Sequence, residues 1–322
     1  MRAAVATSQN PDDPLSCLEL KDVPTPEPPA GWTRVQVKAS SLNQHDLWTL
    51  RGVGHDPKNI PIILGCDVAG VTEDGREVVV HPIIADPDQG FGDETLDPNR
   101  RLLSEAHDGG FAEYVVVPDR CILDKPQHLS FEETACLPVA WGTAYRMLFT
   151  QAQIKPGDRV LVQGAAGGVA SAAITMAAAA GARVWVTSRT EAKRQIALEL
   201  GAEAVFESGA RLPERVDAVI ETVGEATWGH SLRCLRPGGA IVVSGATTGP
   251  APTEELTRIF YQQLRILGST GSTRTETRAM VKLVEQFELR PRIDRVLPLE
   301  QIKDGFAAMR DGELNGKIVI SL

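Results

Sequence analysis

The sequence has few cysteines, and none of them stands in a close pair. Five cysteines are scattered over 322 residues, and no C-x-x-C motif occurs. A cysteine-rich structural zinc site is therefore excluded, and the spacing offers no disulfide framework. Free thiols are typical of a reducing cytoplasm, where we expect this protein. The five are Cys17, Cys66, Cys121, Cys136 and Cys234.

Positive charge and long apolar runs are also scarce. The chain has 33 lysines and arginines against 42 acidic residues, which gives a net charge of −9. Nucleic acids and anionic membranes bind basic surfaces, so neither is an expected partner. No apolar stretch follows Arg2, and the longest apolar run, 169–182, is mostly alanine. We therefore expect neither a secretory signal nor a membrane span.

The segment 159–182 reads as an apolar strand, a turn of glycine and alanine, and a helix of small residues. Small residues let the backbone approach the phosphates of a dinucleotide, and the helix start offers free N–H groups and a positive dipole end. A glycine-rich turn alone is weak evidence, but its strand–turn–helix context favours nucleotide binding. The turn residues expected at the pyrophosphate are Ala166, Gly167, Gly168 and Val169.

The chain changes character near residue 130. Before it, short β-prone segments such as 33–39 and 112–118 alternate with glycine, proline and aspartate clusters. The polar stretch 86–110 predicts a long irregular lobe. After residue 130, strands and helices alternate, which indicates a parallel, doubly wound α/β sheet. The length leaves room for two domains.

Seven segments spread over nearly the whole chain carry a resemblance: SSLNQHDLWTLRG (40–52), PIILGCDVAG (61–70), DGGFAEYVVVP (108–118), LPVAWGTAYRML (137–148), AAGGVA (165–170), CLRPGGAIVVSG (234–245) and NGKIVI (315–320). Together they resemble the medium-chain dehydrogenase/reductase superfamily, and within it the zinc-less quinone oxidoreductase-like branch. The resemblance implies an α/β protein with two domains. A GroES-like β-barrel catalytic domain would span 1–125 and be completed by 270–322. A Rossmann dinucleotide-binding domain would span 126–269.

Zinc-dependent members of that superfamily use a Cys, a His and a second Cys as protein ligands. The resemblance places Asn43, Cys66 and Val139 at these positions. Valine cannot bind a metal, and an asparagine amide is a poor zinc ligand. Cys66, with only Asp67 beside it, would hold zinc weakly. The lobe at 86–110 matches a structural zinc lobe but contains no cysteine. We therefore expect no zinc at either place.

The adenosine end of the expected cofactor site favours NADPH. NAD-specific folds carry an acidic residue at the end of the second strand. Here that strand runs into Ser188 and Arg189, with Lys193 shortly after, and a hydroxyl with two cations suits a 2′-phosphate. Glu191 falls in the first turn of a helix, where it suits the helix dipole. The alternative is a solvated helix start with incidental charges.

Loops that follow strands of the parallel sheet should border the cofactor, because ligands of open α/β sheets bind at the carboxyl ends of strands. The resemblance adds Lys317, at a family position that places a cation on the pyrophosphate; the alternative is a surface lysine. It also implies a homodimer through the strand that leads into Gly268. The loop residues are Thr222, Val223, Ser244, Gly245, Ala246, Ser269 and Thr270.

The resemblance also names candidates near the nicotinamide. Asn43 replaces a ligand and carries an amide donor for the nicotinamide or the substrate carbonyl, unless it is a turn-forming residue at a strand end. Thr143 matches a family threonine beside the nicotinamide, or it caps a helix. Trp48 stands where many quinone reductases have a tyrosine, and its indole can form an aromatic wall but cannot act as an acid. His45 replaces a proton-relaying hydroxyl, or it is a surface or packed histidine.

These features predict a zinc-independent oxidoreductase that transfers a hydride from NADPH to a quinone or an α,β-unsaturated carbonyl. Conjugation in such an acceptor spreads the charge that arrives with the hydride, so positioning and hydrogen bonds suffice where a plain ketone needs a Lewis acid. One alternative is a zinc-dependent alcohol dehydrogenase, and another is a nucleotide-binding family member without turnover. An enoyl-thioester reductase also stays open, although no basic cluster for a coenzyme A phosphate stands near the barrel segments.

Overall fold

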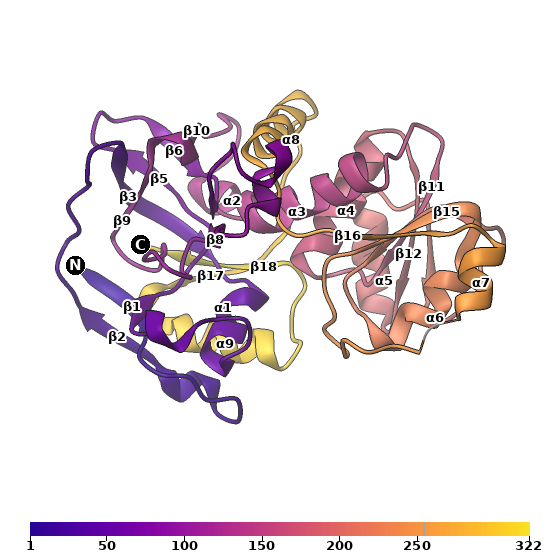
Figure 1. The fold of residues 1–322 in the computed structure, drawn as a ribbon, viewed down its shortest axis with the longest axis horizontal. Helices are drawn as coiled ribbons and strands as arrows, with labels where there is room; N and C mark the ends of the chain where they lie inside the picture. The colour runs from indigo at the N-terminus through magenta and orange to yellow at the C-terminus, as the bar shows by residue number, and fades with distance from the viewer. Residues whose placement is uncertain (254) are drawn as a thin grey trace. The chain divides into compact units, whose positions relative to one another are not determined.

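A computed structural model describes residues 1–253 and 255–322, and the chain divides into two compact units (Figure 1). The first unit comprises Met1–Ala140 and Ser272–Leu322, and the second comprises Trp141–Gly271. In the described residues, no helix is both long and apolar enough to cross a membrane.

The first boundary lies later than the expected residue 125, because the segment that follows packs on the first unit. Helix α2 (Phe131–Thr134) contacts strands of that unit, and Ala135 and Cys136 are buried with Ala39, Ala69 and Val319. The second boundary, between Gly271 and Ser272, lies within two residues of the expected one.

Strands dominate the first unit, as its β-prone pattern predicts. The larger sheet has the order β10–β6–β5–β3–β18–β17, with β9 also paired to β3, and a smaller sheet has the order β2–β1–β4. The last strand of the chain, β18, pairs antiparallel with β3 (Figure 1), so the C-terminal segment completes this unit. The strands are β1 (Arg2–Ala6), β2 (Leu18–Asp22), β3 (Trp32–Ser41), β4 (Ile62–Ile63), β5 (Ala69–Thr72), β6 (Glu77–Val80), β9 (Tyr114–Pro118), β10 (Ile122–Asp124), β17 (Ile293–Pro298) and β18 (Lys317–Ser321).

The helices of this unit close its cores. On α9, apolar residues at Ile302, Phe306 and Met309 recur at helical spacing, so they share one face. That face is buried with Leu47 and Leu50 of α1. The helices are α1 (Gln44–Arg51), α2 (Phe131–Thr134), α8 (Arg274–Gln286) and α9 (Ile302–Arg310).

The stretch 86–110 is an irregular lobe, as expected. The short strand β7 (Ile83–Ile84) precedes it and pairs with β8 (Arg101–Leu102), which lies within it. A buried carboxylate, Glu94, ties the lobe to the rest of the unit. It lies 3.3 Å from His81 Nε2 and accepts hydrogen bonds from the Arg120 guanidinium and the Arg274 backbone N–H. Burial alone would raise its pKa, but these partners hold the pKa of Glu94 down at about 2.

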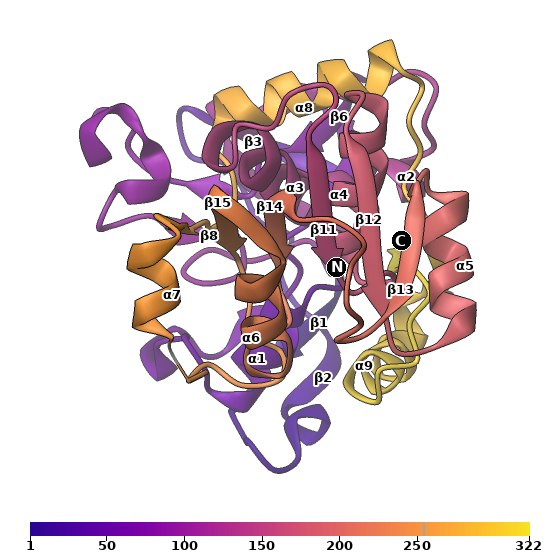
Figure 2. The same ribbon diagram turned by 90° about the vertical axis from the view of Figure 1, so that its right-hand side faces the viewer.

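The second unit is the doubly wound sheet that the alternating pattern predicts. Its six strands are parallel, in the order β13–β12–β11–β14–β15–β16, and Figure 2 shows the sheet from another side. Trp228 of α6 and Ile259 of α7 pack with Leu161 and Val219 on one face. The strands are β11 (Arg159–Gln163), β12 (Arg183–Ser188), β13 (Ala204–Glu207), β14 (Val216–Glu221), β15 (Leu235–Val243) and β16 (Arg265–Gly268). The helices are α3 (Gly142–Tyr145), α4 (Gly168–Ala179), α5 (Glu191–Glu199), α6 (Glu225–Cys234) and α7 (Leu256–Tyr261). A π-helical segment, Leu137–Trp141, begins in the first unit and ends at the first residue of the second.

Candidate functional site

The glycine turn after β11 leads directly into α4. Gly164 takes φ +85°, which favours glycine, and its N–H donates to Thr187 O at 3.0 Å. At Gly167, the N-cap of α4, an added Cβ would meet nothing within 4 Å, so the backbone there faces open space. The first residue to bond back to Gly167 O is Ser171. The N–H groups of Gly168, Val169 and Ala170 precede that bond, as an anion site at a helix start requires.

The other predicted loops lie at the same edge of the sheet. Ser244 N donates to Glu221 O at 3.0 Å, Thr248 N to Val223 O at 2.8 Å and Ser269 N to Val243 O at 2.9 Å. The turn and these loops are therefore neighbours at the carboxyl ends of parallel strands. Brought together there are Ala166, Gly167, Gly168, Val169, Thr222, Val223, Ser244, Gly245, Ala246, Ser269 and Thr270.

One buried group at this edge points to a ligand. The Ser269 hydroxyl is buried and has no hydrogen-bond partner among the described residues. A buried hydroxyl without a partner is costly, and a bound molecule can supply the missing bond. Together with the open backbone at Gly167, it fits a dinucleotide lying across the strand ends.

Sequence reasoning missed the residue that orders the central loop, Glu221. This carboxylate at the end of β14 is fully buried. It accepts from the backbone N–H of Val223 at 2.8 Å and Gly224 at 3.1 Å, and from the hydroxyls of Thr227 at 2.9 Å and Ser231 at 2.6 Å. The available signal was a charged residue directly after the apolar run Ala218–Ile220.

The Glu221 network continues across β11. Gln163 Nε2 donates to Ser231 Oγ and to His230 Nδ1, both at 2.9 Å. His230 therefore carries its proton on Nε2, which donates to Ala210 O at 2.8 Å. The Thr187 hydroxyl of β12 donates to Gln163 Oε1. Side chains of three neighbouring strands are thus bonded into one network beneath the predicted cofactor loops.

At the expected adenosine end, the predicted polar residues lie close to an arginine that the sequence did not predict there. Ser188 ends β12, Arg189 is exposed, and Lys193 lies in the first turn of α5. Arg194, which the sequence analysis did not single out, donates to Ser188 O at 2.9 Å and pairs with Glu191 at 2.6 Å. Glu191 is in the first turn of α5, as expected.

In the first unit, the buried carboxylate of Asp67 gathers several predicted positions. Its Oδ2 accepts from Ser41 Oγ at 2.6 Å, from Asn43 Nδ2 at 2.8 Å and from Lys317 Nζ at 3.3 Å. Its Oδ1 accepts from the backbone N–H of Val139 at 2.8 Å. Asp67 itself has no exposed surface. Residues distant in the sequence therefore meet at one anion.

This geometry corrects the expectation for Lys317. Its ammonium also donates to Leu42 O at 2.7 Å and to Asn43 Oδ1 at 2.8 Å, so each of its three N–H groups has an acceptor within the first unit. None is left for a pyrophosphate, and the side chain is buried rather than on the surface. The closing NGKIVI motif alone does not reveal these partners, which are far away in the sequence.

The role expected for Asn43 also needs correction. Its second amide N–H donates to Ser41 O at 3.2 Å, so no amide donor is left for a substrate carbonyl. Its backbone N–H donates to Asp46 Oδ2 at 2.9 Å, and Asn43 begins α1 as its N-cap. The turn-forming alternative describes it better, because a strand end and a helix start meet at this residue.

Other candidates are placed but not brought together. Trp48 is half-buried on α1, and Thr143 is buried in α3 of the second unit. Their convergence on a nicotinamide stays a prediction. His45 Nε2 lies 3.7 Å from Glu105 Oε1, and burial lowers the pKa of His45 to about 4, so its ring is neutral near pH 7.

Two family models match the chain. The Alcohol dehydrogenase GroES-like domain matches residues 29–127, and the Zinc-binding dehydrogenase family matches residues 168–286. A zinc-type alcohol dehydrogenase-like protein of Schizosaccharomyces pombe is 32% identical, with 91% of each chain covered. The chain belongs to the medium-chain dehydrogenase/reductase superfamily, a group of oxidoreductases.

Two further relatives of this superfamily differ in their chemistry. A crotonyl-CoA reductase of Streptomyces avermitilis is 31% identical, with 89% of this chain and 78% of the relative covered. The crystal structure of an NAD-dependent alcohol dehydrogenase matches with a TM-score of 0.93 at 33% identity, over 100% of both chains. The expected α/β architecture, with its GroES-like and Rossmann domains, is confirmed.

The positions that correspond to the zinc ligands of the superfamily do not fit a catalytic zinc. The Asn43 amide is engaged at both ends, and Val139 offers no side-chain donor. Burial raises the pKa of the Cys66 thiol well above its usual value, and the thiol lies 3.3 Å from Ser104 Oγ. Burial also raises the pKa of neighbouring Asp46 to about 7. Within the described part of the chain, no three His, Cys, Asp or Glu side chains are placed to share a metal ion.

Proposed function

We propose that this protein is a zinc-independent oxidoreductase that transfers a hydride from NADPH to an α,β-unsaturated carbonyl compound or a quinone. The observation that carries the proposal is the ligand-position set of the first unit, where an engaged amide, a single buried thiol and a valine replace the metal donors. A saturated ketone needs its oxygen polarised by a Lewis acid. A conjugated acceptor delocalises the incoming charge and needs mainly positioning.

Among conjugated acceptors, the crotonyl-CoA reductase relative favours enones and enoyl thioesters over quinones. NADPH, when bound, supplies the hydride, which would add to the β-carbon of the acceptor while a proton adds to the α-carbon. In the second unit, the N–H groups at the start of α4 would bind the pyrophosphate. The Glu221 network would fix the loop 222–224, and Ser269 Oγ would find its missing partner.

NADPH is proposed over NADH on the residues at the end of β12. Ser188, Arg189 and Lys193 offer a hydroxyl and two cations. Two acidic residues lie nearby, Glu191 and Glu207, and both pair with Arg194, at 2.6 and 3.8 Å; neither stands at the end of β12. A 2′-phosphate would therefore meet positive charge there.

A panel of acceptors tests the function. NADPH oxidation is followed with crotonyl-CoA, simple enones, quinones, aldehydes and alcohol–NADP⁺ pairs. We expect turnover with conjugated acceptors and none with saturated aldehydes or alcohols. Turnover of a saturated alcohol would favour the alcohol dehydrogenase alternative, which the names of two relatives raise. Stoichiometric NADPH binding without turnover of any acceptor would favour a non-catalytic role.

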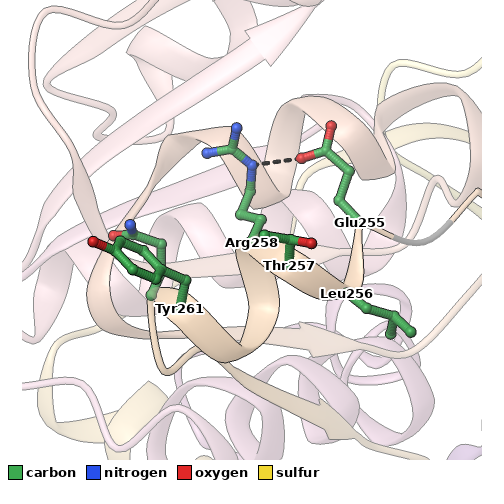
Figure 3. A pocket seen from close by; sticks show the side chains of 6 residues that line it. Glu255, Leu256, Thr257, Arg258 and Tyr261 are labelled. Carbon is green, nitrogen blue, oxygen red and sulfur yellow. Dashed lines mark hydrogen bonds and ion pairs between the residues drawn. The ribbon is translucent and has the colours of Figure 1, made fainter.

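We also propose that two copies pair through the open edge of the second unit's sheet. Among the described strands, β16 pairs only with β15, and its Ile266 is exposed. Helix α7 carries exposed Leu256, Phe260 and Tyr261, and an open hollow of about 520 Å³ lies along it (Figure 3). An unpaired edge beside exposed apolar side chains suits the same surface of a second copy. The five free, buried thiols are the reason to propose the cytoplasm as its location.

A further inference from the structure

Arg194 joins the end of β12 to two carboxylates. Its Nη1 donates to Ser188 O at 2.9 Å, while its Nε and Nη2 donate to Glu191 Oε2 at 3.0 and 2.6 Å. Nη2 also lies 3.8 Å from Glu207 Oε1. Ser188 and Glu207 are partners in the parallel pairing of β12 with β13, and each ends its strand. One guanidinium therefore holds both carboxylates near the strand ends where the adenosine of the cofactor is expected.

These ion pairs contribute little to the stability of the fold. The Arg194 side chain is 12% exposed, whereas those of Glu191 and Glu207 are 81% and 80% exposed. Ion pairs with carboxylates so exposed stabilise a protein weakly, because water solvates the separated carboxylates as well. The guanidinium is held at the strand end by its bond to Ser188 O, and the two carboxylates on it face the solvent from which a ligand arrives.

The charge at these strand ends depends on this arginine. The segment 188–194 carries three cations and one carboxylate, and Glu207 adds a second carboxylate. Together these five groups leave one net positive charge, and without Arg194 they leave none. A phosphate dianion would then meet two carboxylates that lack their partner. We propose that Arg194 determines the choice between NADPH and NADH, because it neutralises Glu191 and Glu207, which would otherwise repel the 2′-phosphate.

Arg194 acts through the two carboxylates and is therefore a positioning residue, while Arg189 and Lys193 are the cations proposed for the phosphate itself. The inference deepens the proposed function and rests on its NADPH assignment, but it does not depend on which acceptor is reduced. NADH carries a hydroxyl where NADPH carries the phosphate, so the two cofactors differ in the one group that the carboxylates would repel. Binding measurements therefore test the inference without turnover.

A set of glutamine variants tests the neutralisation. The fluorescence of bound NADPH and NADH gives their Kd values for the wild type, for Arg194→Gln, and for the triple variant Arg194→Gln, Glu191→Gln, Glu207→Gln. We expect Arg194→Gln to raise the Kd for NADPH about tenfold and to change the Kd for NADH by less than about twofold.

The triple variant decides how Arg194 acts. Its two glutamines carry no charge that needs neutralising, so we expect the Kd for NADPH to return to within about twofold of the wild-type value. A tenfold loss that persists in the triple variant would overturn the proposal, because Arg194 would then act on the phosphate directly or on the shape of the strand end.

Ionic strength separates neutralisation of charge from a structural role. Raising the salt concentration from about 0.1 to about 1 M shortens the Debye length from about 10 to about 3 Å. The ratio of the NADPH Kd values of Arg194→Gln and wild type should therefore fall from about tenfold to about twofold. Arg194→Lys keeps the charge but loses the planar fork, and we expect it to retain most of the preference for NADPH.

A ratio that does not change with salt, together with equal losses for the lysine and glutamine variants, would contradict the proposal. Arg194→Met, which keeps an unbranched stem, replaces Arg194→Gln in the same comparisons if the glutamine variant does not fold.

Arg183 offers a matched control on the same strand. It begins β12, and its Nε and Nη2 donate to the Glu203 carboxylate at 3.0 and 2.8 Å. This arginine–glutamate pair lies at the amino end of the strand, whereas ligands of open α/β sheets bind at the carboxyl ends. We expect Arg183→Gln to leave both Kd values within about twofold of wild type. A tenfold loss of NADPH affinity in this variant as well would mean that any paired arginine of the strand has the effect, which contradicts the proposal.

The two proposals fail separately. A wild-type protein that prefers NADPH in binding but reduces no acceptor contradicts the proposed catalytic function and leaves the comparison of variants standing. A wild-type protein that reduces enones with NADPH, paired with a triple variant that stays tenfold weaker, contradicts the role of Arg194 alone. A wild-type protein that binds both cofactors equally contradicts the NADPH assignment and, with it, the role of Arg194.

Discussion

Replacing Glu221 by glutamine should loosen the central cofactor loop. The variant keeps an oxygen for the backbone N–H groups of Val223 and Gly224, but it turns an –NH₂ group toward the hydroxyls of Thr227 and Ser231. Each hydrogen bond to a charged acceptor contributes about 1.5–3 kcal/mol, so the free energy of unfolding should fall by about 2–4 kcal/mol. For a unit of this size that lowers the melting temperature by about 10 °C.

Binding should weaken together with stability. Because the loop 222–224 borders the proposed cofactor site, we expect the Kd for NADPH to rise about tenfold, or by about 1.4 kcal/mol. Scanning fluorimetry measures the melting temperature, and the fluorescence of bound NADPH measures the Kd. Glu225→Gln is the control, since Glu225 is an exposed carboxylate in the first turn of α6 and contributes at most about 1 kcal/mol through the helix dipole. Equal effects of the two variants would refute the importance of the network.

Three further outcomes are expected. Arg189→Ala should raise the KM for NADPH about tenfold and leave the KM for NADH nearly unchanged; equal changes would remove the 2′-phosphate assignment. Glu94 has a folded pKa of about 2 against an ordinary value of 4.5, so it stabilises the lobe above about pH 4.5 and this stabilisation is lost as the pH falls toward 2. Glu94→Gln should therefore lower the free energy of unfolding at pH 7 by up to about 3 kcal/mol. It should also flatten the acid-unfolding curve below pH 4.5, measured by circular dichroism, and an unchanged curve would contradict the stabilising role of the cluster around Glu94. Ile266→Asp should convert a dimer into a monomer in light scattering, whereas Val53→Asp, an exposed change in the first unit, should not; a wild-type monomer would contradict the proposed pairing.

Much of the second unit could be predicted from the sequence, because its signals are local. The apolar segment Arg159–Gln163, the glycine turn and the small-residue helix follow each other directly, and the structure has them in that order. The carboxyl ends of parallel strands share one edge, so the loops after β14, β15 and β16 could be placed without any contact being known.

The site in the first unit could not be predicted in the same way. Lys317 and Asp67 are 250 residues apart, and Asn43 and Asp67 are 24 apart, so neither pair leaves a periodic signal. The resemblance supplied the positions but also suggested a free amide at Asn43 and a pyrophosphate contact for Lys317. Instead, both side chains donate hydrogen bonds to the buried carboxylate of Asp67, because a buried carboxylate needs donors.

The domain boundary was misplaced for a related reason. The segment 126–140 contains a short helix and therefore reads like the beginning of the α/β pattern. Its small residues Ala135 and Cys136 nevertheless pack against β3, β5 and β18. Whether a helix belongs to one unit or the other is decided by which surface its apolar side chains cover, and that surface is distant in the sequence.

The most direct test of the central claim is the rate of NADPH-dependent crotonyl-CoA or enone reduction by protein whose metal content has been measured, before and after treatment with a strong chelator. We expect less than about 0.1 equivalent of zinc and an unchanged kcat/KM after chelation. Stoichiometric zinc, together with a rate that disappears on chelation and returns when zinc is added, would contradict the account.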